Sequence, residues 1–137
     1  HVSMESALAY HGLIPEAVYQ VSSVTIGRTR RFKTPLGVFT FSRVPTIDPM
    51  AGVRAEKVDA SGWAFVASPI RAIADLVYLR KEIRWESDGL RFLTDSLRID
   101  EDEMRRMHRA DLDEVHRGFK NLRTKSYLEG LRKELSR

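Results

Sequence analysis

Apolar residues are densest between residues 68 and 80, where they recur at the spacing of an α-helix. Because they cover nearly the whole surface of that helix, the pattern predicts a helix that is buried on most sides. Ser68 stands at the N-cap position, and Pro69 follows at the first helical position, where its missing N–H costs nothing. We therefore predict a central buried helix over 69–80, with an apolar surface made of Ile70, Ala72, Ile73, Ala74, Leu76, Val77 and Leu79.

Two charged residues interrupt this apolar surface. Arg71 and Asp75 are four positions apart and can pair along one polar stripe, with the cation on the N-terminal side, which is the weaker orientation. Because an unpaired buried charge is costly, Asp75 must find a partner. Arg71 is the nearest candidate, and an arginine from the segment 28–43 is the alternative.

A shorter amphipathic segment opens the chain. Ser3 is placed to cap a first helix, and Gly12 is placed to end it. His11 lies on the apolar face, which favours a hydrogen-bonded core or boundary histidine over a general base. The other residues of that face are Met4, Ala7 and Leu8.

Between these two helices the apolar period changes from helical to alternating. Residues 21–44 predict a meander of three short strands, with a β-turn at 34–37. Residues 54–59 predict a weaker strand. Residues 63–67 predict a buried strand that leads into the central helix.

Beyond residue 80 the chain is predicted to be helical. Asp100 and Glu103 have the spacing of a capping box, with Asp in place of the usual Ser or Thr, ahead of a helix that carries Met104 and Met107. Further helices are indicated by three stripes: Leu90, Leu93 and Leu97; Leu112, Val115, Phe119 and Leu122; and Tyr127, Leu128, Leu131 and Leu135.

These elements predict one domain of the α+β class over residues 1–137. A small mixed or antiparallel sheet, with its strands within about 21–67, packs on the central buried helix 69–80. A helical C-terminal subregion follows over about 88–137.

Composition restricts the chemistry and the cellular setting. The chain has no cysteine, which excludes disulfides and cysteine-based zinc sites. It has no apolar run of the ~20 residues that a membrane span needs, and no signal peptide. We therefore expect a cytoplasmic protein without a membrane partner. Since a helix follows almost directly after His1, we also expect a further N-terminal part upstream of this chain.

Positive charge is concentrated in one segment. The net charge is +4, with 17 arginines against 6 lysines, and residues 21–44 hold five basic side chains and no acid. This bias has two equally weighted interpretations: an edge hairpin that charge protects from aggregation, or a contact surface for a partner or for phosphates. Strand alternation puts Arg28 and Arg30 on one side and Arg31 and Lys33 on the other. The candidate contact residues are Arg28, Arg30, Arg31, Lys33 and Arg43.

The sequence contains no catalytic pattern that outweighs a structural interpretation. The eight glycines are never closer than ten residues apart, which excludes phosphate-cradling loops, and no lysine has an acid two positions before it, which argues against the common metal-dependent nucleases. His108 and His116, with Asp111 nearby, lack zinc-ligand spacing, and the acidic run 100–103 suits a helix start. No Gly-x-Ser-x-Gly elbow is present. We therefore expect no enzymatic activity, no cofactor and no metal.

Three separated blocks resemble one protein family. The segment 4–15, which ends in Tyr-His-Gly-Leu-Ile-Pro, looks like the opening of the effector domain of AbiEi-family antitoxins of type IV toxin–antitoxin systems. The resemblance continues through 29–37, with Thr-Arg-Arg-Phe and Thr-Pro-Leu-Gly, and ends in the central helix, where Ile70 stands at a position that is usually acidic. The matching signature residues are Ser68, Pro69, Ala72, Asp75, Leu76 and Tyr78, together with His11 and Gly12.

The resemblance covers residues 2 to about 80 and implies a function. It implies an antitoxin of an abortive-infection system that counters a nucleotidyltransferase-like toxin, either directly or by competing for its target. Family members usually carry an N-terminal winged-helix domain that binds DNA and regulates transcription of the operon, and residues 1–137 contain none. Two other hypotheses remain: a nucleic-acid-binding regulatory module acting through the arginine-rich strands 28–43, and an enzyme of unrecognised type. The enzyme would require a deep pocket lined by converging polar groups.

Overall fold

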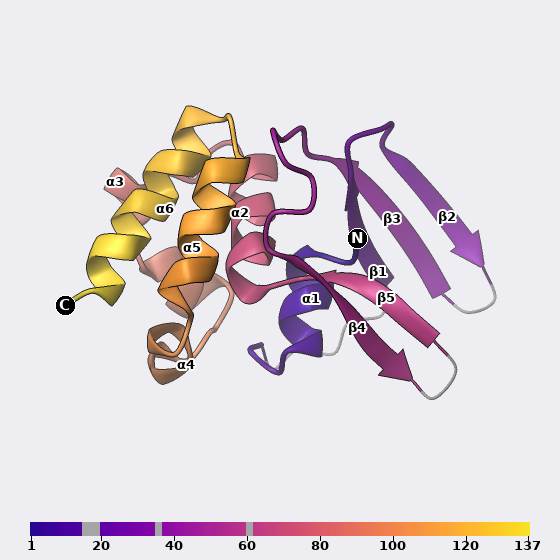
Figure 1. The fold of residues 1–137 in the computed structure, drawn as a ribbon, viewed down its shortest axis with the longest axis horizontal. Coiled ribbons are helices and arrows are strands. Elements are labelled where there is room, and N and C mark those ends of the chain that lie inside the picture. The colour runs from indigo at the N-terminus through magenta and orange to yellow at the C-terminus, as the bar shows by residue number, and fades with distance from the viewer. Residues whose placement is uncertain (15–19, 35–36, 60–61) are drawn as a thin grey trace.

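The computed structural model describes residues 1–14, 20–34, 37–59 and 62–137. It confirms the α+β class, with strands gathered on one side of a central helix and the C-terminal helices on the other (Figure 1). The strands are β1 (Gln20–Thr25), β2 (Arg30–Thr34), β3 (Gly37–Arg43), β4 (Val53–Asp59) and β5 (Gly62–Ala67). The helices are α1 (Met4–Tyr10), α2 (Pro69–Leu79), α3 (Trp85–Asp88), a π-helical turn (Phe92–Ser96), α4 (Glu101–Arg105), α5 (Arg109–Gly118) and α6 (Leu122–Leu135).

The three strands of the arginine-rich segment form a sheet, but the predicted meander is wrong. The strand order is β1-β3-β2, with β1 parallel to β3 and β2 antiparallel to β3. β2 therefore takes the outer edge, where the side chains of Arg30 and Arg31 are exposed, and β3 takes the middle. Alternation along a sequence identifies strands but carries no information on which strands pair. The predicted turn at 34–37 includes residues 35–36, which lie outside the described residues.

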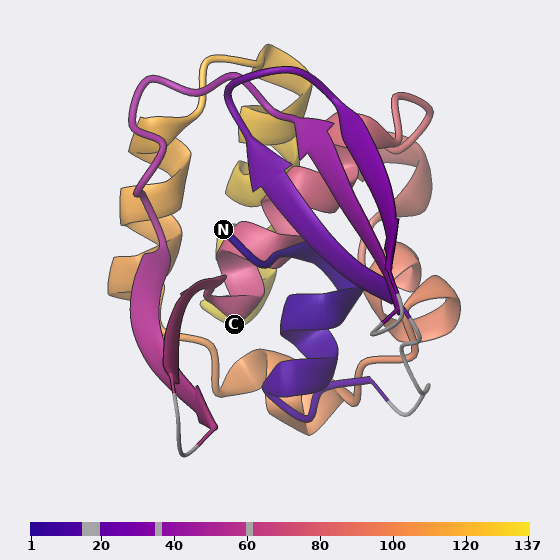
Figure 2. The same ribbon diagram turned by 90° about the vertical axis from the view of Figure 1, so that its right-hand side faces the viewer.

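The N-terminal residues join this sheet to the antiparallel hairpin of β4 and β5. Val2 forms β-bridges to Ser23 of β1 and to Val66 of β5. The N-terminal residues therefore lie between the two groups of strands and connect them (Figure 2). α1 and α2 pack against the inner side of this arrangement, where Val24 and Val66 are buried.

The central helix forms as predicted, over Pro69–Leu79. The Ser68 hydroxyl accepts a hydrogen bond from the Arg71 backbone N–H at 3.2 Å, which satisfies one free donor of the first turn. Every residue from Ile70 to Val77 is buried, because sheet, α1, α5 and α6 surround the helix.

The buried carboxylate of Asp75 pairs with Arg71, as the local alternative predicted. Arg71 Nε donates to Asp75 Oδ1 at 2.9 Å, and the Arg71 guanidinium also donates to the carbonyls of Pro49 and Ala51. The Ser3 hydroxyl donates to Asp75 Oδ2 at 2.5 Å. Burial raises the pKa of the Asp75 carboxyl, and Arg71 and the Ser3 hydroxyl act in the opposite direction.

Ser3 therefore serves the core rather than α1. It occupies the N-cap position of α1 but makes no side-chain cap hydrogen bond in the described structure, because its hydroxyl is directed at Asp75. His1 Nε2 lies 3.2 Å from the second Asp75 oxygen, so the chain start and the central helix share one polar cluster. The alternative prediction, that an arginine from residues 28–43 pairs with Asp75, is wrong.

An arginine that the sequence did not single out caps the C-terminal end of α2. Arg123, in the first turn of α6, donates from Nη1 to the carbonyls of Val77 at 2.6 Å and Ile83 at 2.7 Å. Its Nη2 donates to the Tyr78 carbonyl at 3.0 Å. These carbonyls lie at or beyond the C-terminal end of α2, where the helix itself offers no donors.

Two details of the helical subregion differ from prediction. The stripe that ends in Phe119 and Leu122 is broken, because α5 ends at Gly118, Asn121 caps a new helix, and Leu122 is 79% exposed. Asp100 does cap α4 by accepting from the Asp102 N–H, but Glu103 pairs with Arg106 at 2.8 Å instead of completing a capping box.

The strand β5 differs most from its prediction. Trp63 is 69% exposed and Phe65 is 55% exposed, whereas Val66 and Ala67 are buried. Only the end of the strand next to α2 lies in the core, because the hairpin of β4 and β5 extends beyond the helices that would cover it (Figure 1).

Candidate interaction surface on the sheet

The structure brings three of the predicted contact residues to one face of the sheet. Arg30 of β2 is paired with Phe41 of β3, and directly opposite residues of neighbouring strands share a face. Arg43 follows Phe41 by two positions and therefore lies on that face as well. Arg28 precedes β2 and lines a common hollow with Arg30.

This hollow has a volume of about 270 Å³ and is lined by Thr25, Gly27, Arg28, Arg30 and Phe41. Arg28, Arg30 and Arg43 are exposed, and none of them forms a hydrogen bond or an ion pair with the part of the chain that the structure describes. The hollow is therefore lined by the unpaired guanidinium groups of Arg28 and Arg30 and by the aromatic residue Phe41.

The other two candidates do not join this surface. Arg31 is exposed but is paired in register with Thr40, so it lies on the opposite face of the sheet. The backbone of Lys33 belongs to β2, and its side chain lies outside the described part of the structure. The division of Arg30 from Arg31 agrees with the strand alternation predicted from the sequence.

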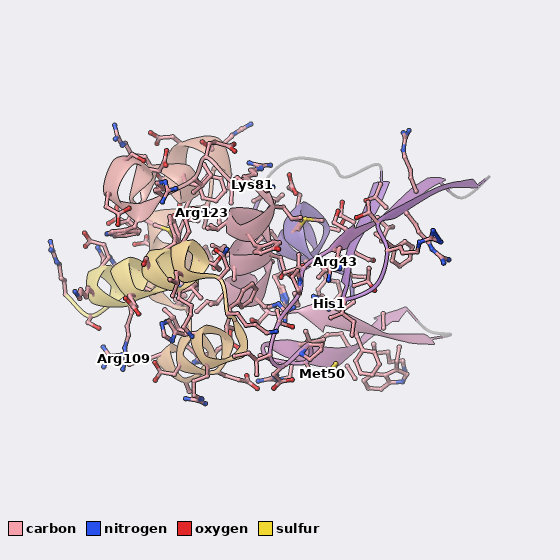
Figure 3. All side chains as sticks on the ribbon, turned by 90° about the horizontal axis from the view of Figure 1, so that it is seen from above. His1, Arg43, Met50, Lys81, Arg109 and Arg123 are labelled. Carbon is pink, nitrogen blue, oxygen red and sulfur yellow. The ribbon has the colours of Figure 1, made fainter. Side chains whose placement is uncertain are left out.

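An apolar hollow adjoins the basic one. It has a volume of about 170 Å³, shares Thr25 with the basic hollow, and includes Ile26, Met50 and Phe65 in its lining. His1 and Arg71 of the Asp75 cluster also line it. Figure 3 shows Arg43, His1 and Met50 at the sheet end of the molecule, with Arg109 and Arg123 in the helical half.

We call the sheet face the two hollows, with Arg28, Arg30, Ile26, Met50 and Phe65, together with two exposed residues that follow from strand alternation: Arg43, two positions after Phe41, and Trp63, two positions before Phe65. Its apolar members were missed by sequence reasoning, which placed Trp63 and Phe65 in a buried strand. The alternation of large Trp63 and Phe65 with small Ala64 is a signal of a two-sided strand. The sequence alone does not show that its aromatic side faces water.

The signature residues take structural positions around α2. His11 Nε2 donates to the Ala67 carbonyl at 2.9 Å, which confirms a hydrogen-bonded boundary histidine. Gly12 has φ +73, a left-handed conformation that glycine adopts without strain, and it follows the end of α1 as predicted. The backbone carbonyl of Tyr78 accepts from Arg123.

Three signature residues also line a second region, the helical cavity. It has a volume of about 760 Å³ and lies between α1, the start of α2, β4, α4 and α5. Ser68, Pro69 and His11 contribute to it, together with His108 and Asp111. The enzyme hypothesis required a deep pocket lined by converging polar groups, and this cavity has polar side chains in its lining.

No histidine base lies within hydrogen-bond distance of Ser68 in the described structure. The Ser68 hydroxyl accepts from the Arg71 N–H and hydrogen bonds to Asp111, and no described histidine hydrogen bonds to it. A catalytic serine needs an adjacent base that takes its proton. Within the described residues there is also no group of three or more acidic or histidine side chains that could hold a metal ion.

No family model matches the chain, and no curated protein or solved structure matches it either. Among the helices of the described residues, none is both long and apolar enough to cross a membrane.

Proposed function

We propose that this chain is a non-enzymatic antitoxin effector domain that counteracts a nucleotidyltransferase-type toxin of a type IV toxin–antitoxin system. One observation supports the proposal above the others. The sheet face presents unpaired Arg28, Arg30 and Arg43, together with exposed Phe65 of the adjoining hollow and exposed Trp63, which precedes Phe65 by two positions on β5. Arginine and large aromatic side chains are the residue types that carry most binding energy in protein interfaces. The resemblance of residues 2 to about 80 to AbiEi-family antitoxins supports a nucleotidyltransferase-like toxin as the class of partner.

The charge of the sheet face defines the kind of surface that the toxin would offer. Three guanidinium groups without an internal partner favour carboxylates on the other side, which they contact in a planar, bidentate manner. The apolar hollow at Met50 and Phe65 favours an apolar side chain of the toxin at its centre.

A nucleic-acid-binding module is the second candidate, and the same face supports it. Arginines can contact phosphates, and exposed aromatic rings such as Trp63 and Phe65 can stack on unpaired bases. The two candidates differ in salt dependence, because phosphate contacts release counterions and make affinity fall steeply as salt rises.

Growth rescue during co-expression with the toxin encoded in the same operon tests the first candidate. We expect this chain to restore growth, and the triple variant Arg28→Glu, Arg30→Glu, Arg43→Glu to lose that ability while its circular dichroism spectrum stays unchanged. If the unmodified chain fails to rescue, or the operon encodes no nucleotidyltransferase, the antitoxin proposal is wrong.

Two control variants distinguish an effect of the sheet face on rescue from an effect of the net charge of the chain. The variant Lys81→Glu, Lys120→Glu, Lys133→Glu changes net charge by the same amount at exposed positions outside the sheet face, and Arg31→Glu changes the opposite side of the sheet. Both should keep rescue. Retention of the chain on single-stranded oligonucleotides at low salt, lost in the sheet-face variant, would favour the nucleic-acid candidate instead.

A further inference from the structure

One histidine in the wall of the helical cavity has a ring nitrogen whose protonation the fold determines. His11 follows the last residue of α1, and its ring meets the ring of Tyr10 edge-on at a centroid distance of 5.2 Å. Its Nε2 lies 2.9 Å from the carbonyl oxygen of Ala67. Because a carbonyl oxygen only accepts, this nitrogen carries the proton, and Nδ1 of the neutral ring is an acceptor.

This acceptor is accessible and has no partner. Within the described residues, the buried side-chain atoms that lack a hydrogen-bond partner are Thr46 Oγ1 and Asp111 Oδ1. His11 Nδ1 also has no partner there, and since it is not one of those buried atoms it is accessible to solvent. Asp111 Oδ1 is too deeply buried for a ligand to contact it. The ring of His108 lines the cavity too, but no hydrogen bond within the described residues fixes its proton, so it does not select between donors and acceptors.

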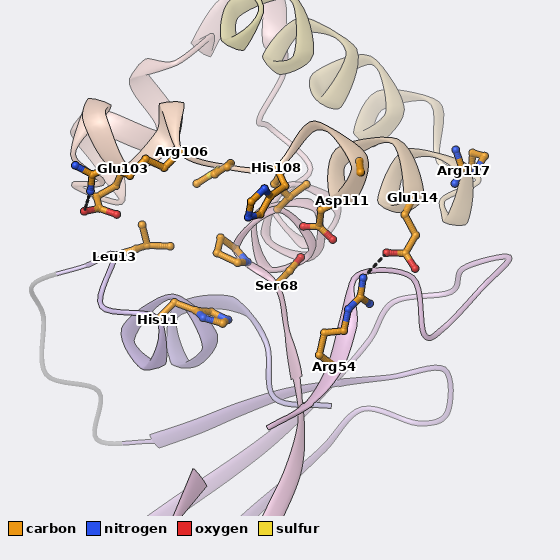
Figure 4. A pocket seen from close by; sticks show the side chains of 14 residues that line it. His11, Leu13, Arg54, Ser68, Glu103, Arg106, His108, Asp111, Glu114 and Arg117 are labelled. Carbon is orange, nitrogen blue, oxygen red and sulfur yellow. Dashed lines mark hydrogen bonds and ion pairs between the residues drawn. The ribbon is translucent and has the colours of Figure 1, made fainter. Parts of the chain in front are cut away.

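The charged groups of the cavity wall do not favour a charged ligand. Arg54 and Arg106 each pair with a glutamate, at 2.9 Å and 2.8 Å (Figure 4). Arg117 forms no ion pair among the described residues, but it is exposed and lies at the far end of α5 from His11 (Figure 4). A charge that enters an apolar pocket loses hydration that must be replaced there. The surroundings of His11 therefore favour a neutral ligand.

Much of the remaining wall is apolar. Leu13, Pro69, Ile70, Met107 and Ala110 contribute hydrocarbon to the lining. A volume of about 760 Å³ falls in the range of sites that bind small organic molecules, in which a few polar groups orient a largely apolar ligand.

We propose that the helical cavity binds a small, neutral, largely apolar molecule that carries a hydroxyl group, with the hydroxyl donating to His11 Nδ1 and the apolar part contacting Leu13 and Met107. This inference does not depend on the proposed antitoxin function, because the cavity and the two hollows of the sheet face share no lining residue.

Titration of the ¹⁵N-labelled chain with two matched probes tests the proposal: 4-ethylphenol and its methyl ether, 4-ethylanisole, which lacks the hydroxyl proton. We expect both probes to shift the amide signals around His11 and Met107. The phenol should bind about fivefold more tightly than the ether, since a hydrogen bond between neutral groups contributes roughly that factor. Absence of these shifts up to the solubility of the phenol, or equal binding of the two probes, would overturn the proposal.

Two charged probes of similar size test the preference for a neutral ligand. The anion of 4-ethylbenzoic acid and the cation of 4-ethylbenzylamine should both bind in the cavity more weakly than the phenol, because neither finds an unpaired opposite charge beside His11. Tighter binding of either one, with shifts at the same amide signals, contradicts the proposal.

The ring nitrogens of His11 report the contact directly and without a variant. In the free chain, their ¹⁵N signals should show a protonated Nε2 and an unprotonated Nδ1. The phenol should move the Nδ1 signal upfield, as accepting a hydrogen bond does, and the ether should leave it in place. A proton on Nδ1 in the neutral ring of the free chain would remove the acceptor and refute the proposal.

Three variants locate the effect. His11→Phe keeps an aromatic ring without an acceptor, and it should remove the fivefold preference for the phenol while the ether still binds. His116→Phe changes a histidine that pairs with Glu129 outside the cavity lining, and it should keep the preference. Ala110→Phe, at an exposed position of the cavity wall, should weaken both probes. A phenol preference that survives His11→Phe contradicts the proposal.

Discussion

The helical core and the sheet face use arginine in opposite ways. In the core, Arg71 is 1% exposed, pairs with Asp75, donates to two carbonyls and lies over the ring of Phe119 at 5.2 Å. On the sheet face, Arg28 and Arg30 are exposed and have no partner among the described residues. The difference shows that residue type alone does not assign a role: the same side chain stabilises the fold in one region and is free for a partner in the other.

The physical basis of this difference is hydration. A buried guanidinium has lost its water, so each donor must be satisfied within the protein, and removing a partner leaves a charge stranded. An exposed guanidinium keeps its water and contributes little to stability whether or not it is paired. Substitutions in the core should therefore alter the free energy of unfolding, and substitutions on the sheet face should alter binding.

The largest expected effect is at Arg71. Arg71→Met keeps an apolar stem but leaves the carboxylate of Asp75 without its cation, so we expect a loss of about 3–5 kcal/mol in the free energy of unfolding. Urea denaturation followed by circular dichroism measures it. The double variant Arg71→Met, Asp75→Leu removes both charges and should recover more than half of the loss. A single-variant loss as small as that of a surface substitution would show that the pair is not an essential part of the core.

The next largest effect is expected at Arg123. Arg123→Met removes the donors that satisfy the carbonyls of Val77, Tyr78 and Ile83, so we expect a loss of about 2–3 kcal/mol, in keeping with hydrogen bonds from a charged donor. Arg109→Met is the matched control, because Arg109 is exposed and donates to the Ser136 hydroxyl near the chain end. Equal losses in the two variants would contradict the assignment of Arg123 as the cap of α2.

A smaller, pH-dependent effect is expected at Tyr127. Its ring is fully buried, its hydroxyl donates to the Gly89 carbonyl at 2.8 Å, and burial raises the pKa of the hydroxyl above its usual value. The folded state holds the Tyr127 hydroxyl proton to a higher pH than the unfolded state does. The contribution of this hydroxyl to the free energy of unfolding is therefore complete below pH ~10, and it falls at higher pH by about 1.4 kcal/mol per pH unit. Denaturation at several pH values should show a shallower alkaline decline in Tyr127→Phe than in Tyr10→Phe, whose ring is 44% exposed. Parallel declines would contradict this.

The smallest effect on stability is expected on the sheet face. Trp63→Ser with Phe65→Ser replaces two exposed rings, and we expect the free energy of unfolding to stay within about 0.5 kcal/mol of the unmodified chain. The same double variant should lose growth rescue or oligonucleotide retention, whichever function holds. A loss of stability comparable to that of Arg123→Met would mean that these rings belong to the core after all.

Several parts of this architecture were accessible from sequence because they depend on local chemistry. The N-cap at Ser68, the stop at Gly12 and the buried helix after Pro69 follow from side-chain spacing and backbone preference within a dozen residues. The pairing of Arg71 with Asp75 was one of two alternatives that the sequence left open, and it was available because residues four apart on a helix are neighbours wherever the helix lies.

Other parts depended on contacts that sequence spacing does not encode. The exposure of Trp63 and Phe65 follows from the extent of the neighbouring helices, which end short of the β4–β5 hairpin. Arg123 caps α2 across a separation of 46 residues from Val77. The helical cavity is likewise lined by His11, Ser68 and Asp111 from three distant segments, so no local sequence motif predicts it.

The sequence by itself determined the α+β class, the central helix with its cap, and the concentration of arginines in residues 28–43. The tertiary structure decided the strand order β1-β3-β2, the pairing of Arg30 with Phe41 of the middle strand, and the partners of Asp75, including the choice of Arg71. The physical reason is the range of the forces involved. Helix caps and i, i+4 pairs act within one turn, whereas burial and hydrogen-bond satisfaction are set by whichever distant segments pack together.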